Sequence, residues 1–118
     1  MAISDELVGG LEPPEDHAGD VQVFFDPDVT LIMLSGEVDL ALGLDLEDAG
    51  RDAIDRGVVV RVDLTRVSFI DSVGLGFIAR LAAAGHAEGQ RPVIVGASRR
   101  IREGFALVGL DPLVEHEA

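Results

Sequence analysis

A β-branched run followed by an apolar helical segment constrains the fold of this chain more than any other feature. Four of the six residues from Val58 to Asp63 are valine, which predicts a strand buried along most of its length. From Ser72 to about Ala84 the apolar residues lie nearly all round a helix, so this helix should have little exposed surface. Residues 64–71 are expected to connect the two. A buried strand beside a buried helix indicates an α/β domain.

The other strands are predicted on both sides of this unit. Strands are expected at 21–26 and 30–34, joined by a turn at 26–28, because alternating apolar residues flank a Pro-containing turn there. Residues 35–39 are expected to leave the sheet, and a short strand is expected at 92–95. The pattern therefore predicts a mixed sheet of four to five strands that opens with an antiparallel hairpin.

Two further helices have recognisable ends. A helix is expected over 40–56, capped by Asp39 and ended by Gly57. Its predicted buried stripe consists of Leu42, Leu46, Ala49 and Ala53. Ser98 is placed to cap a third helix, and Gly109 to end it. The residues expected to share its buried face are Ile101, Phe105 and Val108.

Composition and charge limit the class of partner. The net charge is −13, which argues against nucleic acid and anionic membrane surfaces. Residues 1–57 carry 15 acids and two arginines, whereas residues 58–102 carry seven arginines and three acids. No apolar stretch approaches the roughly 18 residues of a spanning helix, and there is no cysteine. We expect a flexible acidic tail over 1–20 and one cytoplasmic domain over 21–118, without direct membrane insertion.

Residues that could support catalysis are sparse. His17, His86 and His116 have neither metal-ligand spacing nor a neighbouring nucleophile, so we expect no metal site. Gly74-Leu75-Gly76 begins a match to a dinucleotide fingerprint, but eight residues separate Ser72 from the strand end expected at Asp63. The chain contains no lysine, hence no phosphate-binding P-loop. We therefore expect no enzyme activity and no cofactor.

The pair Asp71-Ser72 interrupts the apolar segments, and two interpretations apply. Either residue can cap the helix that follows. An exposed serine at a helix N-terminus is also a favourable place for a phosphate, which the free N–H groups and the helix dipole stabilise. A phosphate adds negative charge beside Asp71, so a docked surface here would be repelled and the site could act as a charge switch.

Three segments in order resemble the STAS domain of bacterial anti-sigma factor antagonists, also called anti-anti-sigma factors. They are Leu34-Ser35-Gly36-Glu37-Val38-Asp39, the stretch Val62 to Gly76 with Asp71-Ser72-Val73-Gly74, and Val108-Gly109-Leu110-Asp111. The resemblance covers about Val21 to Val114. It implies the STAS fold, in which helices pack on one side of a mixed sheet.

The resemblance also implies a partner-switching mechanism of the kind used in stress response and sporulation. In this family the unphosphorylated antagonist binds an anti-sigma factor, often a serine kinase, and so releases a sigma factor for transcription; a phosphatase reverses the phosphorylation. Carried over, Ser72 is the phosphoacceptor, and Val73 stands where many members have Ser or Thr. The expected partner surface comprises Asp39, Thr65, Ser68, Asp71, Ser72, Val73, Gly74 and Phe77. The protein itself is expected to be a monomer or a weak homodimer.

Two other functions compete with this one. Stand-alone STAS proteins also serve lipid ABC transporters by binding the ATPase subunit through the same helix end, and Ser72 with Gly74 favours the sigma-factor role over that one. A small nucleotide-dependent enzyme ranks last. The arginines at the start of the third helix, Arg99, Arg100 and Arg102, oppose the helix dipole and are either ordinary exposed charges or a contact for an acidic partner surface.

Overall fold

One mixed sheet with a layer of helices on one face forms the core of the protein. The computed structural model describes residues 18–118 of the chain. The strands are β1 (Asp20–Phe25), β2 (Val29–Val38), β3 (Val59–Ile70), β4 (Val93–Val95) and β5 (Glu115–Glu117). The helices are α1 (Gly43–Arg56), α2 (Ser72–Ala87) and α3 (Arg99–Leu107), with 3-10 turns η2 (Leu40–Leu42) and η3 (Asp111–Leu113). No helix among these residues is long and apolar enough to cross a membrane.

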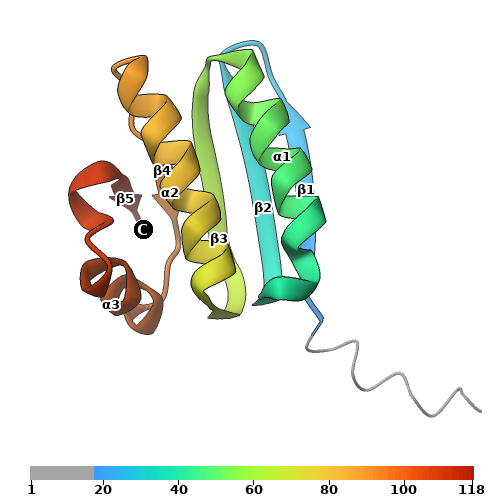
Figure 1. The fold of residues 1–118 in the computed structure, drawn as a ribbon, viewed down its shortest axis with the longest axis vertical. Helices are drawn as coiled ribbons and strands as arrows, with labels where there is room; N and C mark the ends of the chain where they lie inside the picture. The colour runs from blue at the N-terminus through green and yellow to red at the C-terminus, as the bar shows by residue number, and fades with distance from the viewer. Residues whose placement is uncertain (1–17) are drawn as a thin grey trace, which may run out of the picture.

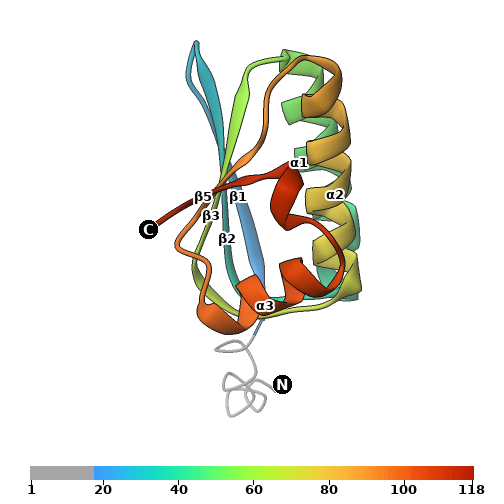
Figure 2. The ribbon, with the colours of Figure 1, turned by 90° about the vertical axis from the view of Figure 1, so that its left-hand side faces the viewer.

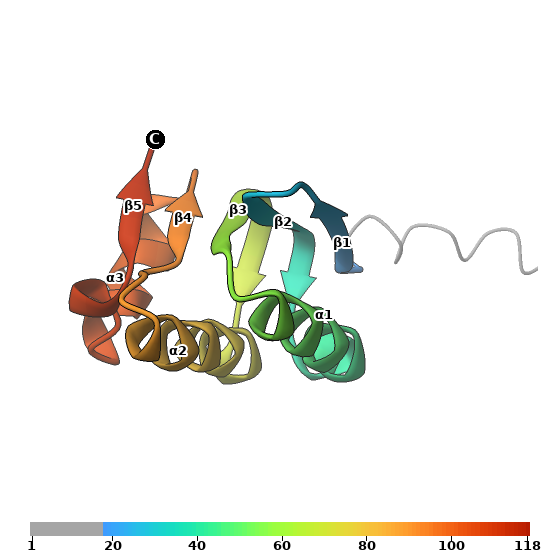
Figure 3. The ribbon, with the colours of Figure 1, turned by 90° about the horizontal axis from the view of Figure 1, so that it is seen from above.

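The strands stand in the order β1-β2-β3-β4-β5 (Figure 1). β1 and β2 pair antiparallel, whereas every later pair is parallel. The predicted opening hairpin and the mixed sheet are therefore confirmed. Figures 2 and 3 show α1 and α2 side by side on one face of the sheet, and within residues 18–118 the opposite face carries no helix. The predicted placement of helices on one side is thus also confirmed.

Alternation along the central strands creates the core. The side chains of Ile32 and Leu34 on β2, and of Val62 and Leu64 on β3, are almost fully buried beneath the helices. The predicted stripe of α1 is confirmed, because Leu42, Leu46, Ala49 and Ala53 are all buried. The residues that alternate with these buried ones along each strand face away from the helices, because successive side chains of a strand point to opposite faces of the sheet.

Helix termini follow the predicted chemistry. Asp39 caps the 3-10 turn η2, because its side chain accepts a hydrogen bond from the amide of Ala41 at 3.0 Å. The helix predicted over 40–56 is therefore divided into η2 and α1, and α1 has no side-chain cap of its own. On α3, the side chain of Ser98 accepts a hydrogen bond from the amide of Ile101 at 3.2 Å, as predicted. Gly57 and Gly109 end their helices with φ of +67° and +77°, the left-handed region that glycine tolerates best. On α3, Ile101 and Phe105 are buried, but Val108 is 57% exposed. The prediction that Val108 shares their face is wrong because α3 ends at Leu107.

The predicted ends of two strands are wrong, because both strands are longer in the structure than the sequence predicts. β2 continues through Val38 instead of ending near Leu34, and β3 continues through Ile70 instead of ending at Asp63. The extensions pair with one another, with shifts of register between Met33 and Ser35 and again after Gly36. Residues 35–39 and 64–71 therefore belong largely to the sheet, and they carry it to the start of α2. Of the tail predicted over residues 1–20, residues 1–17 lie outside the described residues, and β1 already begins at Asp20.

Candidate functional site

Asp39 and Asp71 come together because two parallel strands end side by side. Val38 on β2 pairs with Ile70 on β3, so the residues that follow them leave the sheet at the same edge. The amide of Asp71 donates a hydrogen bond to the carbonyl of Val38 at 3.0 Å. The predicted proximity of Asp39 to the serine motif therefore follows from the strand extensions described above.

Asp71 is the residue that caps α2. Its backbone is extended, and its Oδ1 accepts hydrogen bonds from the amides of Val73 at 2.8 Å and Gly74 at 3.4 Å. Ser72 is then the first helical residue, exposed to solvent. The sequence allowed either Asp71 or Ser72 to cap α2, and the structure shows that Asp71 does so. The Ser72 hydroxyl is consequently not needed for capping.

Two residues expected at the partner surface are buried instead. Phe77 has no exposed surface, and Gly74 is buried beneath the helix start. A Cβ on Gly74 would stand 2.5 Å from Cγ1 of Ile70 and 2.8 Å from Cγ1 of Val38. Gly74 therefore allows α2 to approach the strand ends closely, and Phe77 anchors the helix in the core. Neither can touch a partner directly, which corrects that part of the predicted surface.

The remaining predicted residues spread along one edge. Val73 is partly exposed beside Ser72, and Ser68 is exposed near the end of β3. Thr65 is also exposed, but it lies roughly 16 Å before the end of β3 at the usual rise per residue. Its amide donates to Oδ1 of Asp63 at 2.8 Å. The structure thus groups Asp39, Asp71, Ser72 and Val73 closely, with Ser68 beside them and Thr65 apart.

A hollow lies on each side of the start of α2. The hollow toward α1 is lined by Leu40, Gly43, Leu44, Glu47, Ser72, Val73, Gly76 and Arg80. The hollow toward α3 is lined by Ser68, Phe69, Ile70, Leu75, Arg100, Ile101 and Gly104. We call these the α1-side hollow and the α3-side hollow. Ser72 itself stands at the rim of the first.

Apolar side chains at these hollows were missed by the sequence reasoning. Leu40 and Leu44 are 77% and 78% exposed, and Phe69 is 50% exposed. Large apolar side chains that face solvent together favour a protein contact over a solvated surface. The exposure of Leu40 and Leu44 could have been predicted from the sequence, because neither residue belongs to the predicted buried stripe of Leu42, Leu46, Ala49 and Ala53.

Charge differs on the two sides of the site. α1 presents acids, including Glu47 in the α1-side hollow, whereas the first turn of α3 presents three arginines. Arg100 lines the α3-side hollow, and Arg99 forms an ion pair with Glu103 at 3.5 Å. The role of Arg99, Arg100 and Arg102 as a contact for an acidic partner stays a prediction. The start of α2 therefore lies between an acidic flank and a basic flank.

Within residues 18–118, no three His, Cys, Asp or Glu side chains are placed to hold a metal ion. Nε2 of His116 lies 3.0 Å from Oδ1 of Asp111, and the centroid of its ring lies 5.5 Å from that of Phe105, with the two rings tilted by 56°. His86 is exposed in the last turn of α2. His17 lies outside the described residues.

The glycine pattern in α2 has a packing role. β3 ends at Ile70, directly before the helix, so the separation that argued against a dinucleotide fingerprint is absent. The glycines nevertheless lie within the helix, as expected, and the space a Cβ would need at Gly74 is filled by Ile70 and Val38. Gly74 therefore faces the sheet, whereas a fingerprint glycine faces a pyrophosphate.

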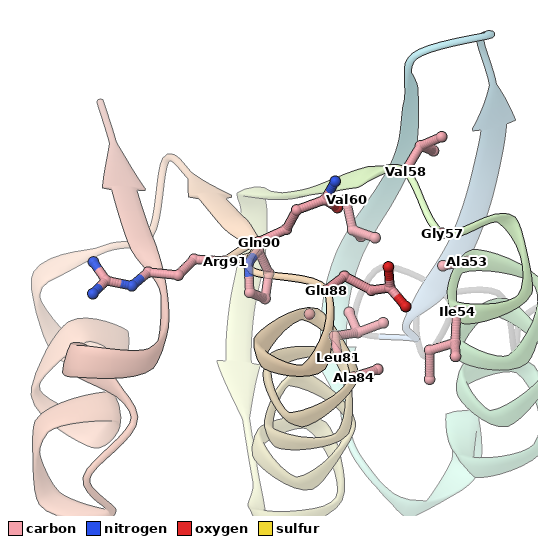
Figure 4. A pocket seen from close by; sticks show the side chains of 12 residues that line it. Ala53, Ile54, Gly57, Val58, Val60, Leu81, Ala84, Glu88, Gln90 and Arg91 are labelled. Carbon is pink, nitrogen blue, oxygen red and sulfur yellow. The ribbon is translucent and has the colours of Figure 1, made fainter.

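Another hollow lies at the opposite end of the helix layer, between the C-terminal ends of α1 and α2 (Figure 4). Ala53, Ile54, Val60 and Leu81 give it an apolar lining, and Glu88 and Arg91 stand at its margin. None of the predicted site residues lines it. This end provides a natural control for experiments on the Ser72 edge.

Comparison with known proteins places this architecture in a family. The family model described as Mlab, STAS domain matches residues 21–115. The chain is 31% identical over 91 residues to the anti-sigma-B factor antagonist of Listeria monocytogenes, covering 76% of this chain and 80% of that one. The same identity and coverage are found for the anti-sigma-B factor antagonist of Listeria innocua.

Solved structures agree with the sequence comparison. An anti-sigma factor antagonist from Mycobacterium paratuberculosis superposes with a TM-score of 0.71 at 25% identity, covering 85% of this chain and 86% of that one. The phosphorylated form of the Bacillus cell fate determinant SpoIIAA has the same fold, with a TM-score of 0.68 at 24% identity and coverage of 84% and 92%. The chain belongs to the STAS-domain family of anti-sigma factor antagonists.

Proposed function

We propose that this protein binds an anti-sigma factor of the serine-kinase type while Ser72 is unphosphorylated, and so releases a sigma factor for transcription. Phosphorylation of Ser72 ends this binding, and a phosphatase restores it. The observation that carries the proposal is the exposed Ser72 hydroxyl at the start of α2, which capping leaves free. The names of the relatives support the partner class, and the phosphorylated form of SpoIIAA supports the modification.

The surface around Ser72 suits a reversible protein contact. Leu40, Leu44 and Phe69 supply exposed apolar surface, and the partly exposed Val73 lines the same hollow as the two leucines. A partner docked here would bring its own surface over the Ser72 hydroxyl. The contact would exclude water around Ser72, which makes a charge at this position costly to accommodate.

A phosphate can switch this surface without unfolding the domain. It adds about 1.5 to 2 negative charges, beside the carboxylates of Asp39 and Asp71. The dipole at the start of a 16-residue helix, whose amides at Val73 and Gly74 stay capped by Asp71, stabilises an anion there, so α2 should stay folded. The bound partner, in contrast, would have to cover the added charge and remove its water, which is costly.

The test uses partners captured from the host with the unmodified protein, followed by calorimetry with the anti-sigma factor so identified. Ser72→Ala should bind like wild type and resist phosphorylation, whereas Ser72→Asp should bind at least about tenfold more weakly, or roughly 1.4 kcal/mol. Intact mass measurement before and after incubation with the kinase detects the phosphate, and the absence of this mass increase in Ser72→Ala assigns it to Ser72. Ser98→Asp is the matched control, because it adds the same charge at the N-cap of α3 and keeps a good capping residue. Equal affinities for wild type and Ser72→Asp would contradict the proposal.

A second candidate is the stand-alone STAS accessory subunit of a lipid ABC transporter, which would bind the ATPase subunit at the same edge. The matching family model is described by its STAS domain without reference to a sigma factor, so it fits both functions. The anti-sigma-B factor antagonists among the relatives favour the first. Capture of an ABC-type ATPase without any anti-sigma factor would select the second. Both functions place the protein in the cytoplasm.

A further inference from the structure

We propose that Arg80 is the cation that pairs with a phosphate on Ser72, and that it holds this phosphate over the bare helix surface at Gly76. The inference rests on the proposed function, since it concerns the phosphorylated state of Ser72. Arg80 is thus a positioning residue for the switch, on the side of α2 that faces α1.

Three residues of α2 carry the geometry. Ser72, Gly76 and Arg80 follow one another at intervals of four residues, so they lie in a row on one face of the helix. All three line the α1-side hollow. Side chains on a helix lean toward its N-terminus, and Arg80 does so: its Nη1 lies 3.8 Å from the point that a Cβ on Gly76 would occupy. The guanidinium therefore already lies one turn closer to Ser72 than its own Cα.

The remaining separation is short. Four residues of helix rise about 6 Å, and the guanidinium of Arg80 stands level with Gly76. Because Gly76 has no side chain, position 76 itself places nothing between the guanidinium and Ser72. A phosphate on Ser72 extends into this space and presents three acceptor oxygens, which match the planar donors of an arginine.

Local charges make Arg80 the counterion that this phosphate would find. Arg80 is the one cation that lines the α1-side hollow, and it takes part in no ion pair within residues 18–118. Glu47 faces the same hollow from α1, and Asp39 and Asp71 flank Ser72 from the strand ends. These three carboxylates repel a phosphate, so its position depends on the cation. On the other side of α2, Arg100 lines the α3-side hollow and is the competing cation.

The test installs the phosphate without a kinase. Phosphoserine is incorporated at position 72 by amber suppression, and the second ionisation of the phosphate is followed by ³¹P NMR as a function of pH. A nearby arginine favours the dianion, so Arg80 should lower the pKa of the phosphate from its usual value of about 6. In Arg80→Gln the midpoint should rise by roughly 0.5 pH unit, a threefold loss of preference for the dianion.

Two variants control for general charge effects. Arg91→Gln removes the same charge at the far end of the helix layer, where Arg91 borders the hollow of Figure 4, and should leave the midpoint unchanged. Arg100→Gln removes the cation from the α3-side hollow and should also leave it unchanged. Circular dichroism checks that each variant, altered at an exposed side chain, stays folded.

The proposal is overturned by an unchanged midpoint in Arg80→Gln, by an equal rise in Arg91→Gln, or by a rise confined to Arg100→Gln. The proposed function is tested apart from this, by calorimetry of the phosphoserine protein against the captured anti-sigma factor. Undiminished binding of the phosphorylated protein would refute the switch whatever the titration shows. A lost switch and a lost Arg80 contact are therefore distinguishable.

Discussion

At the scale of the residue, two glycines two positions apart in α2 have opposite surroundings. Gly74 faces the strand ends, where a Cβ would stand within 3 Å of Ile70 and Val38. Gly76 faces the α1-side hollow, where the nearest atom to an added Cβ is Nη1 of Arg80 at 3.8 Å, an ordinary contact. The first glycine therefore serves packing against the sheet, and the second keeps the helix surface bare beside Ser72.

This contrast predicts opposite effects of alanine on stability. Gly74→Ala should lower the free energy of unfolding by about 1 to 3 kcal/mol, because the side chains of the two strands must move. Gly76→Ala should raise it by about 0.5 to 1 kcal/mol, since alanine favours the helix interior and meets no clash. Urea denaturation of both variants and wild type measures the difference. Equal effects from the two substitutions would contradict the packing role assigned to Gly74.

The same scale shows how far the site could be predicted from the sequence. The motif around Ser72 was found through its resemblance to a family, and Asp39 with it, because those residues stand in a recognisable order. Leu40 and Leu44 were missed because helical periodicity identifies the buried face and treats every other position as solvated. Phe77 was misplaced for the converse reason: proximity in sequence to Ser72 does not place a side chain on the same face of a helix.

At the scale of the element, the helices were easier to predict than the ends of the strands. Caps and glycine stops have local chemical causes, so Asp39, Gly57 and Ser98 could be assigned from the sequence alone. The extensions of β2 and β3 could not, because their register shifts break the alternation by which strands are recognised. Gly36, with φ of +70°, lies in such an irregular stretch, and its Ser-Gly context reads as a turn.

The edge strand β5 is tied to β3 by an ion pair that spans β4. Nη2 of Arg61 lies 2.6 Å from Oε1 of Glu117, and Nη1 lies 3.1 Å from Oε2. The hydrogen bond from Arg61 lowers the pKa of Glu117 below its ordinary value of 4.5 in the folded state, and the same hydrogen bond raises the pKa of Arg61. Because both side chains are substantially solvated, the pair makes a small contribution that salt should weaken.

This ion pair predicts a pH-dependent difference between wild type and Glu117→Gln. A carboxylate with a lowered folded-state pKa stabilises the fold above its unfolded pKa, and this stabilisation is lost as pH falls through the folded value. The melting temperature of wild type should therefore slightly exceed that of Glu117→Gln at pH 7, by about a degree. The gap should close below pH 4.5, the ordinary pKa of Glu117. A gap that persists unchanged at pH 3 would show that the charge of Glu117 is not its source.

At the scale of the whole molecule, the parallel arrangement of β2 and β3 separates two surfaces. The Ser72 site lies at the edge where these strands end, and the hollow of Figure 4 lies at the opposite edge. In Figure 1 both α1 and α2 begin at the edge where β2 and β3 end, and α3 lies beside them. The acidic α1 and the arginine-bearing start of α3 therefore flank the start of α2. The charge asymmetry noted along the sequence becomes an asymmetry across this edge, which the sequence alone could not place in space.

The separation of the two edges can be tested on α1, which carries an exposed apolar side chain near each. Leu44 lines the α1-side hollow and is 78% exposed, whereas Ile54 lines the hollow at the far end and is 41% exposed. Changing either to serine removes apolar surface and replaces it with the same small polar side chain in the same helix. The two substitutions carry a similar, small helix-propensity cost.

If the partner binds at the Ser72 edge, Leu44→Ser should weaken binding of the captured anti-sigma factor about 5- to 30-fold, because a buried leucine at an interface is worth roughly 1 to 2 kcal/mol. Ile54→Ser should leave the affinity unchanged while lowering the melting temperature more than Leu44→Ser does, since Ile54 is the more buried of the two. Calorimetry and thermal denaturation of the same preparations give both quantities. Equal loss of affinity in the two variants would mean that the contact extends along the whole helix layer, in which case the Ser72 edge alone could not act as the switch.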